Sequence, residues 1–273
     1  MLSKVSQTLY IPLMGRIYAS RRHPAVLYDA AALAMEPKLP PEVRRLSGQT
    51  EYTLLASAVR SRNVDETVRR FLCAHPDGVI VNVGCGLDTA YQRNDNGVAL
   101  WFDLDMPDVI SLRRQYFPLG ARERELPYSM FDGQWVRDVQ AEGERPLLAI
   151  ASGLFYYFPE KQVIEWMTML SAFPYAELAF DAVSSRGIAH TRRFMRRMKK
   201  QDAQMFFALD DAKAFAQKIP TSVTVLGEER FYRLACRAWK ASPITRVMMW
   251  VSDKLQMVKM VRLRFEAGNN SAP

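Results

Sequence analysis

Four short apolar runs alternate with helix-length segments, and this alternation constrains the fold more than any other feature of the sequence. The runs are GVIVNVG (78–84), GVALWFDLDMP (97–107), RPLLAIASGLFYYF (145–158) and AELAFDAVS (176–184). The first run carries no charge, which is typical of a strand buried on both faces of a parallel sheet. Segments 107–117 and 159–173 are long enough to be crossover helices. The sequence therefore predicts an α/β fold with a parallel sheet.

A glycine loop, Gly84-Cys85-Gly86, follows the first predicted strand. Glycine adopts positive φ readily and lets a ligand approach the backbone. The segment after the loop suits a helix, whose N-terminus attracts anions. An acid that binds ribose hydroxyls is expected about 20 residues beyond such a loop. Asp105 and Asp103 both lie close to that interval, so the pattern favours a ligand over a simple tight turn.

The dinucleotide-binding fingerprint is incomplete, because Thr89 stands where it requires a third glycine. That glycine allows close helix packing beneath a pyrophosphate. Its absence favours a nucleoside ligand that lacks a pyrophosphate. S-adenosylmethionine is the obvious ligand of this kind.

Composition limits the remaining function classes. The chain has 273 residues and a net charge of +8, which suits one large globular domain or a domain with a cap. Cys73, Cys85 and Cys236 are far apart and the three histidines are scattered, so we expect no metal site and a reducing compartment. The sequence contains neither a signal-peptide pattern nor an apolar run of spanning length. We therefore expect a cytoplasmic protein.

Several motifs together resemble one methyltransferase family. VIVNVGCGLDTAYQR, LWFDLDMPDVI and LLAIASGLFYYF, with VRSRNVDETVRRFL before the first strand, are similar to the leucine carboxyl methyltransferase superfamily. Within it they resemble the tetracenomycin-type polyketide O-methyltransferases. The resemblance implies a class I methyltransferase (Rossmann-like) fold: a mainly parallel seven-stranded sheet, helices on both faces, a final antiparallel strand at 257–266 and a helical cap. It implies a cap at 1–75 and an S-adenosylmethionine-binding domain at 76–273, with a helical insertion around 185–218.

The resemblance also implies a set of cofactor-binding residues. Gly84 and Gly86 would approach the methionine end of S-adenosylmethionine, with Cys85 between them as a small filler rather than a nucleophile. Asp105 would take the ribose hydroxyls, with Asp103 as the second choice. The other members of the implied site are Arg60 facing the cofactor carboxylate, Arg16 as a weaker second basic contact, Asp132 on the adenine side, and Ser152.

Two positions depart from the family pattern. Ala90 stands where many members carry arginine, while Arg93 keeps the later basic position. Ser152 stands where the carboxyl methyltransferases carry a glutamate that faces the amino end of the cofactor. The second departure argues against a protein-leucine carboxyl methyltransferase.

The implied activity is S-adenosylmethionine-dependent O-methyl transfer to a small-molecule acceptor, polyketide-like or with another carboxyl or hydroxyl group. The enzyme must align the nucleophile with the methyl group and exclude water. A carboxylate acceptor needs no base, whereas a hydroxyl acceptor benefits from one. The candidate catalytic residues are Tyr156, Tyr157 and Asp181. Core packing is the alternative for the tyrosines, and pairing with an arginine is the alternative for the aspartate.

A basic helix after residue 184 leaves the choice of partner open. Its basic residues are Arg192, Arg193, Arg196, Arg197, Lys199 and Lys200. A solvated helix face is the simplest interpretation, and the alternatives are an acidic carrier protein, an anionic lipid surface or RNA. A later helix that holds Met248, Met249, Trp250 and Val251 adds peripheral membrane contact as an alternative. Two other functions stay open: an RNA-directed methyltransferase, which ranks lower because no RNA-binding module is visible, and a non-catalytic scaffold that kept the fold.

Overall fold

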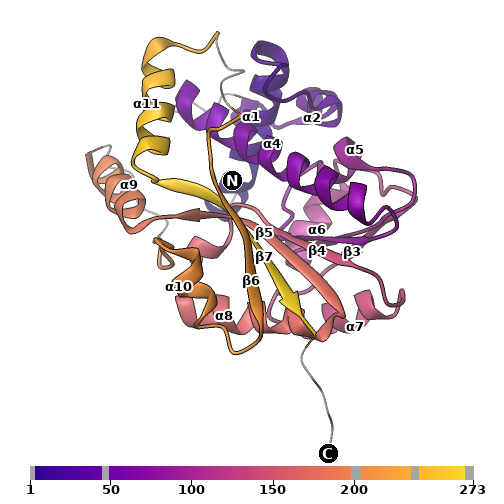
Figure 1. Ribbon diagram of the computed structural model, residues 1–273. Coiled ribbons are helices and arrows are strands. Elements are labelled where there is room, and N and C mark those ends of the chain that lie inside the picture. The colour runs from indigo at the N-terminus through magenta and orange to yellow at the C-terminus, as the bar shows by residue number, and fades with distance from the viewer. Residues whose placement is uncertain (1–3, 45–48, 198–203, 235–239, 268–273) are drawn as a thin grey trace, which may run out of the picture.

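The computed structural model describes residues 4–44, 49–197, 204–234 and 240–267, and one seven-stranded sheet lies at its centre (Figure 1). The strands are β1 (Val79–Val83), β2 (Leu100–Leu104), β3 (Glu123–Leu126), β4 (Leu147–Ala151), β5 (Tyr175–Val183), β6 (Val223–Arg230) and β7 (Val258–Glu266). Their order across the sheet is β3-β2-β1-β4-β5-β7-β6. Neighbouring strands from β3 to β5 are parallel, whereas β7 is antiparallel to both β5 and β6. The predicted class I methyltransferase sheet, with its final antiparallel strand, is confirmed.

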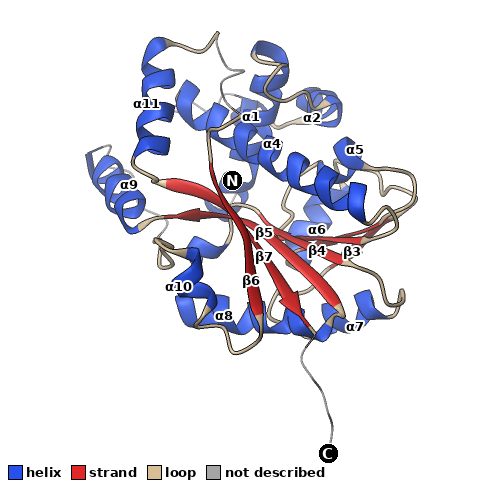
Figure 2. Ribbon diagram, in the orientation of Figure 1, coloured by secondary structure: helices blue, strands red, loops and turns tan. Residues whose placement is uncertain are grey.

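Helices cover both faces of this sheet (Figure 2). They are α1 (Lys4–Arg22), α2 (Ala30–Met35), α3 (Pro41–Arg44), α4 (Glu51–Ala74), α5 (Ala90–Asn94), α6 (Pro107–Arg114), α7 (Gln134–Gln140), α8 (Glu160–Thr168), α9 (Ser185–Arg197), α10 (Ala212–Ala216) and α11 (Pro243–Lys254). Short 3-10 helices are η1 (Glu36–Lys38), η2 (Phe155–Tyr157) and η3 (Met169–Ala172). The predicted crossover helices therefore form, as α6 and as α8 with η3.

Helices α4 and α5 pack on one face of the sheet. Val64 and Val68 of α4 lie in the same buried cluster as Ile80 of β1. Apolar residues recur along α4 at helical spacing, so one stripe of this helix faces the strands. The C-terminal half of α4 is thus a layer on the sheet, although the predicted cap extends to residue 75. The division into cap and methyltransferase domain stays a prediction.

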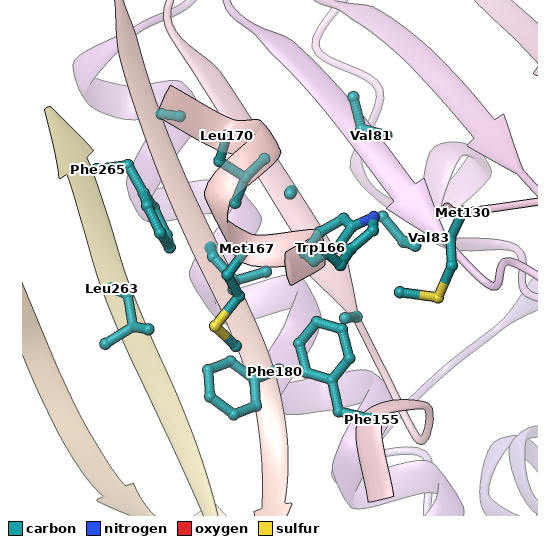
Figure 3. Close-up of a cluster of buried hydrophobic side chains, with 14 of the residues drawn as sticks. Val81, Val83, Met130, Phe155, Trp166, Met167, Leu170, Phe180, Leu263 and Phe265 are labelled. Atoms are coloured by element: carbon teal, nitrogen blue, oxygen red, sulfur yellow. The ribbon is translucent and has the colours of Figure 1, made fainter. Parts of the chain in front are cut away.

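Aromatic side chains fill the opposite face (Figure 3). Trp166 of α8 stacks on Trp135 of α7, with ring centroids 6.1 Å apart. Phe155 meets Phe180 of β5 edge to face at 5.2 Å. Large side chains buried in this way each stabilise the fold by about 1.5–3 kcal/mol. This layer holds the ends of β4 and β5 in place.

Two details of the predicted strands were wrong. The third predicted strand, 145–158, ends at Ala151, because the backbone turns at Gly153 and the aromatic run forms η2. The prediction also missed β3, whose sequence EREL has no apolar run. Glu123 of β3 is nonetheless buried, because its carboxylate pairs with Arg113 of α6 at 3.0 Å. A charged edge strand of this kind carries no hydrophobic period to recognise.

The N-terminal helices cover the glycine loop. Leu13 and Ile17 of α1 pack in one buried cluster with Leu87, which directly follows the loop. None of the described helices is long and apolar enough to cross a membrane. Lys199, Lys200 and Cys236, which were considered in the sequence, lie outside the described residues.

Candidate active site

The carboxyl ends of four parallel strands bring the predicted residues into one row. Val83 of β1 pairs with Leu104 of β2 on one side and with Ala151 of β4 on the other. Ala151 in turn pairs with Phe180 of β5. The residues that come directly after these paired strand positions are Gly84, Asp105, Ser152 and Asp181. The strand order reverses between β1 and β4, and ligands of open α/β sheets bind at that point.

The glycine loop has a backbone that requires its glycines. Gly84 and Gly86 have φ of 64° and 50°, in the left-handed region. A Cβ atom at Gly84 would lie 2.9 Å from a methyl carbon of Leu154. The N–H of Gly86 donates to Asp105 at 2.8 Å, and the N–H of Met106 donates to the other carboxylate oxygen at 2.7 Å. The loop and the acid after β2 are therefore joined directly.

Spacing in the sequence allowed either Asp103 or Asp105 as the acid that binds the ribose, and Asp105 is the accessible one of the two. It is half-buried, and burial raises the pKa of its carboxyl group. Asp103 is fully buried and lies 2.6 Å from Arg113. It also accepts a hydrogen bond from Asn82 at 3.0 Å, and burial raises its pKa to about 8. Since protein groups enclose Asp103, Asp105 is the one of these two acids that can offer lone pairs to a ligand.

Arg60 and Asp181 form an ion pair beside the end of β4. The Arg60 Nε donates to Asp181 at 3.1 Å, and the N–H of Gly153 donates to the second carboxylate oxygen at 2.5 Å. Asp181 is buried, whereas 22% of the Arg60 side chain is exposed. A Cβ atom at Gly153 would lie 3.3 Å from both Arg60 Nη1 and the Tyr156 hydroxyl. Asp181 thus holds the guanidinium at the strand ends, where it can meet a carboxylate.

The two tyrosines of η2 differ in their surroundings. Tyr156 is buried, and burial raises the pKa of its hydroxyl group. Tyr157 is 41% exposed, and its ring meets Tyr156 edge to face at 4.6 Å. At neutral pH the Tyr156 hydroxyl is protonated, so it can donate a hydrogen bond but cannot accept a proton as a base.

Arg16 lies in a buried contact rather than at the strand ends. Its Nε donates to Asp29 at 3.0 Å, and its Nη2 donates to the carbonyl oxygen of Leu87 at 2.5 Å. Only 2% of the residue is exposed, and burial lowers the pKa of the guanidinium. Arg16 therefore ties α1 to the glycine loop, and this position does not suit the predicted contact with a cofactor carboxylate.

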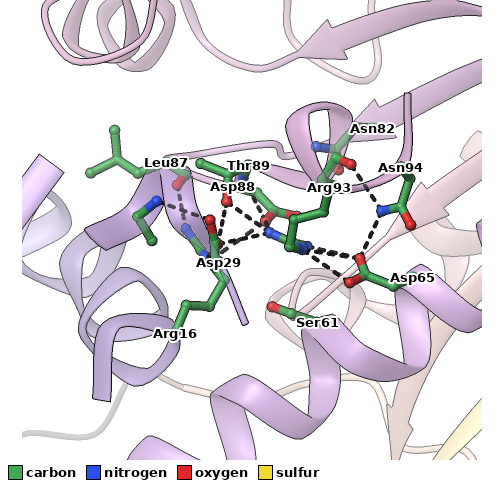
Figure 4. Close-up of polar contacts among 12 residues, drawn as sticks. Arg16, Asp29, Ser61, Asp65, Asn82, Leu87, Asp88, Thr89, Arg93 and Asn94 are labelled. Atoms are coloured by element: carbon green, nitrogen blue, oxygen red, sulfur yellow. Dashed lines mark hydrogen bonds and ion pairs between the residues drawn. The ribbon is translucent and has the colours of Figure 1, made fainter. Parts of the chain in front are cut away.

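Arg93 is the centre of a larger network that the sequence did not reveal (Figure 4). Its guanidinium makes a two-pronged contact with Asp65 of α4, at 3.0 Å from Nε and from Nη2. Its Nη1 also contacts Asp29 at 3.0 Å and the Thr89 hydroxyl at 2.7 Å. Burial by itself would lower the pKa of Arg93, but the surrounding carboxylates outweigh it and leave the pKa raised. The Asp88-Thr89 pair thus turns inward, and the network joins α2, α4 and α5 beneath the loop.

The other predicted residues are more peripheral. Asp132 is exposed, and its carboxylate accepts the N–H of Gln134 at 2.8 Å, at the start of α7. Ser152 is half-buried directly after β4. Cys85 is buried, and burial raises the pKa of its thiol, which suits a filler rather than a nucleophile. Ala90 is buried in the cluster between α4 and the sheet, so its small size fits close packing there.

Comparisons with known proteins find methyltransferases. The family model for leucine carboxyl methyltransferases matches residues 14–171. The tetracenomycin polyketide synthesis O-methyltransferase TcmP of Streptomyces glaucescens is 32% identical over 184 residues, which cover 67% of each chain. The S-adenosyl-L-methionine-dependent methyltransferase dpfgK of Gibberella zeae is 25% identical and covers 91% of each chain. The crystal structure of a candidate methyltransferase from Thermobifida fusca has a TM-score of 0.50 at 16% identity, covering 93% of this chain and 95% of that one.

Proposed function

Because the chain belongs to the leucine carboxyl methyltransferase family, whose cofactor is S-adenosylmethionine, we propose that it methylates an oxygen atom of a small-molecule acceptor. The likeness to TcmP, named for polyketide O-methylation, supports a polyketide-like acceptor. The observation that carries the proposal is the pairing of the glycine loop with Asp105 at the switch point of the sheet.

The described residues fit this cofactor. Gly84 and Gly86 give the loop its left-handed backbone, and Asp105 can accept hydrogen bonds from ribose hydroxyls. Arg60 can pair with the cofactor carboxylate, because its exposed edge lies beside Gly153. When bound, S-adenosylmethionine supplies an activated methyl group on a sulfonium, which brings its own leaving group. The chain must then bind and orient the cofactor and the acceptor, and it must exclude water from the site.

The residues near Gly153 favour an acceptor that is already ionised. Both carboxylate oxygens of Asp181 accept hydrogen bonds from Arg60 and Gly153, so Asp181 is poorly placed to take a proton. The raised pKa of Tyr156 likewise keeps its hydroxyl group protonated. We therefore propose a carboxylate or an acidic phenol as the nucleophile, because neither needs a general base.

Calorimetric titration with S-adenosylmethionine, S-adenosylhomocysteine and NADH tests the cofactor assignment. We expect dissociation constants on the order of micromolar for the first two ligands and no heat of binding for NADH. Transfer of a radiolabelled methyl group to aromatic polyketide acids or phenols then tests the acceptor. If neither S-adenosylmethionine nor S-adenosylhomocysteine binds, the scaffold alternative is favoured, and Ala90 and Ser152 are the first positions to test as the cause.

An Arg60→Gln variant is expected to bind S-adenosylhomocysteine about tenfold more weakly, because it loses one charge-assisted contact with the ligand carboxylate. Glutamine still offers a donor to Asp181, so the fold should persist. Titration calorimetry measures the affinity, with Arg70→Ala as the control on the same helix, where Arg70 pairs with Glu229 at 2.9 Å. If the two variants bind equally well, Arg60 does not face the carboxylate.

A further inference from the structure

Helix α11 buries polar side chains and exposes apolar ones. Thr245 and Ser252 are 4% and 2% exposed, whereas Ile244 and Trp250 are 74% and 65% exposed. Further exposed apolar side chains, in the helix or directly after it, are Val247, Met248 and Leu255. A helix that serves only to cover a protein core shows the opposite distribution. Together these exposed apolar side chains form a stripe on α11, which is suited to contact with an apolar environment outside the protein.

The exposed stripe follows helical spacing. Ile244, Val247 and Leu255, with the half-buried Val251 between them, recur at intervals of three or four residues, so they share one face. Met249, which the sequence analysis grouped with the membrane-facing residues, is instead buried and packs toward the protein. The twelve residues of α11 thus divide into a protein-facing side and an outward apolar side.

The chain after α11 leads directly to the edge of the sheet that holds the candidate active site. Val258, at the start of β7, pairs with Val183 at the carboxyl end of β5. Met249 lies in the same buried cluster as Val59, the neighbour of Arg60. A surface that binds α11 would therefore lie near the strand ends where an acceptor must enter.

Basic side chains border the stripe. Arg246 and Lys254 of α11 are exposed, and so are Arg192 and Arg193 of α9, which lies on the same side of the molecule (Figure 1). Asp253 is drawn inward, because its carboxylate accepts the N–H of Tyr232 at 3.0 Å. An apolar stripe with tryptophan and flanking cations is typical of helices that lie in a lipid interface.

We propose that the outward face of α11 docks on an anionic lipid surface. Such a surface offers an apolar interior for the exposed apolar side chains and negative charge for the basic side chains. A second copy of the chain offers an apolar surface but not the negative charge: it carries the same net charge of +8, and a symmetric contact would oppose like cations. This inference does not depend on the acceptor proposed above.

Flotation with lipid vesicles tests the proposal. Vesicles of phosphatidylcholine with an equal amount of phosphatidylglycerol should carry the wild-type protein upward, and vesicles of phosphatidylcholine alone should carry less. An Ile244→Ser/Trp250→Ser variant should partition at least about tenfold more weakly, because two large apolar side chains no longer enter the lipid. The matched control is Val98→Ser/Leu119→Ser, at positions 52% and 55% exposed, and it should float like the wild type.

Tryptophan fluorescence gives an independent readout. Trp101, Trp135 and Trp166 are fully buried, and Trp239 lies outside the described residues. The measurement is therefore made in a Trp239→Phe background, in which added vesicles should shift the emission of Trp250 to shorter wavelength. A Trp250→Phe variant should lose that shift while it retains its thermal unfolding temperature.

Three results would overturn the proposal. The first is absence of flotation with the anionic vesicles. The second is equal flotation of the wild type and the Ile244→Ser/Trp250→Ser variant. The third is a wild-type dimer that this variant converts to a monomer, without flotation of either, which would assign the face to a second copy.

Discussion

An Asp105→Ala variant is expected to bind S-adenosylmethionine about a hundredfold more weakly than the wild-type protein. Hydrogen bonds to a charged group contribute about 1.5–3 kcal/mol each, and loss of two at the lower value corresponds to about two orders of magnitude in affinity. The variant also frees the N–H of Gly86, which donates to Asp105 at 2.8 Å. Titration calorimetry with S-adenosylmethionine and S-adenosylhomocysteine measures the loss.

Asp108→Ala is the matched control for this experiment. Asp108 is an exposed acid in the first turn of α6, three residues further along the chain. Its removal changes the net charge by the same amount but leaves the glycine loop untouched, so near wild-type affinity is expected. Wild-type affinity in Asp105→Ala itself would show that the ribose acid lies elsewhere.

Replacing Arg93 by alanine is expected to lower the free energy of unfolding by about 3–5 kcal/mol, because it leaves buried carboxylates without their partner. Asp29 and Asp65 are 0% and 1% exposed, and both lie 3.0 Å from the Arg93 guanidinium. Urea denaturation followed by circular dichroism measures the change. Arg93→Lys should fall between the variant and the wild type, because lysine keeps the charge but loses the two-pronged contact with Asp65.

An Arg69→Ala variant is the control for this experiment, because it removes an ordinary surface ion pair instead of the buried network. Arg69 contacts the same Asp65, but at 3.9 Å and with 46% of its side chain exposed. Its loss should change the free energy of unfolding by no more than about 1 kcal/mol. If Arg93→Ala and Arg69→Ala destabilise equally, the network beneath the glycine loop does not stabilise the fold as described.

Local patterns were enough to predict the central parallel strands and the glycine loop. The run at 79–83 is apolar apart from Asn82, as expected of a central parallel strand buried on both faces. Gly84 and Gly86 were recognisable because positive φ is a local requirement. The motifs around them also indicated the family and its cofactor, which the comparisons bear out.

Residues far apart in the chain decided the rest. Spacing in the sequence could not distinguish Asp103 from Asp105 as the acid that binds the ribose. The distinction depends on Arg113, which pairs with Asp103 in the folded protein. The family resemblance likewise assigned Arg60 and, as a weaker second contact, Arg16 to the cofactor carboxylate, although Arg16 pairs in the buried network and Arg60 borders the strand ends. Ion pairing and burial depend on residues that pack together from distant parts of the chain, so a local sequence pattern does not indicate them. The sequence by itself therefore determined the central strands, the loop and the family, whereas only the tertiary structure revealed the edge strand β3 and decided which charged side chains remain free to meet a ligand.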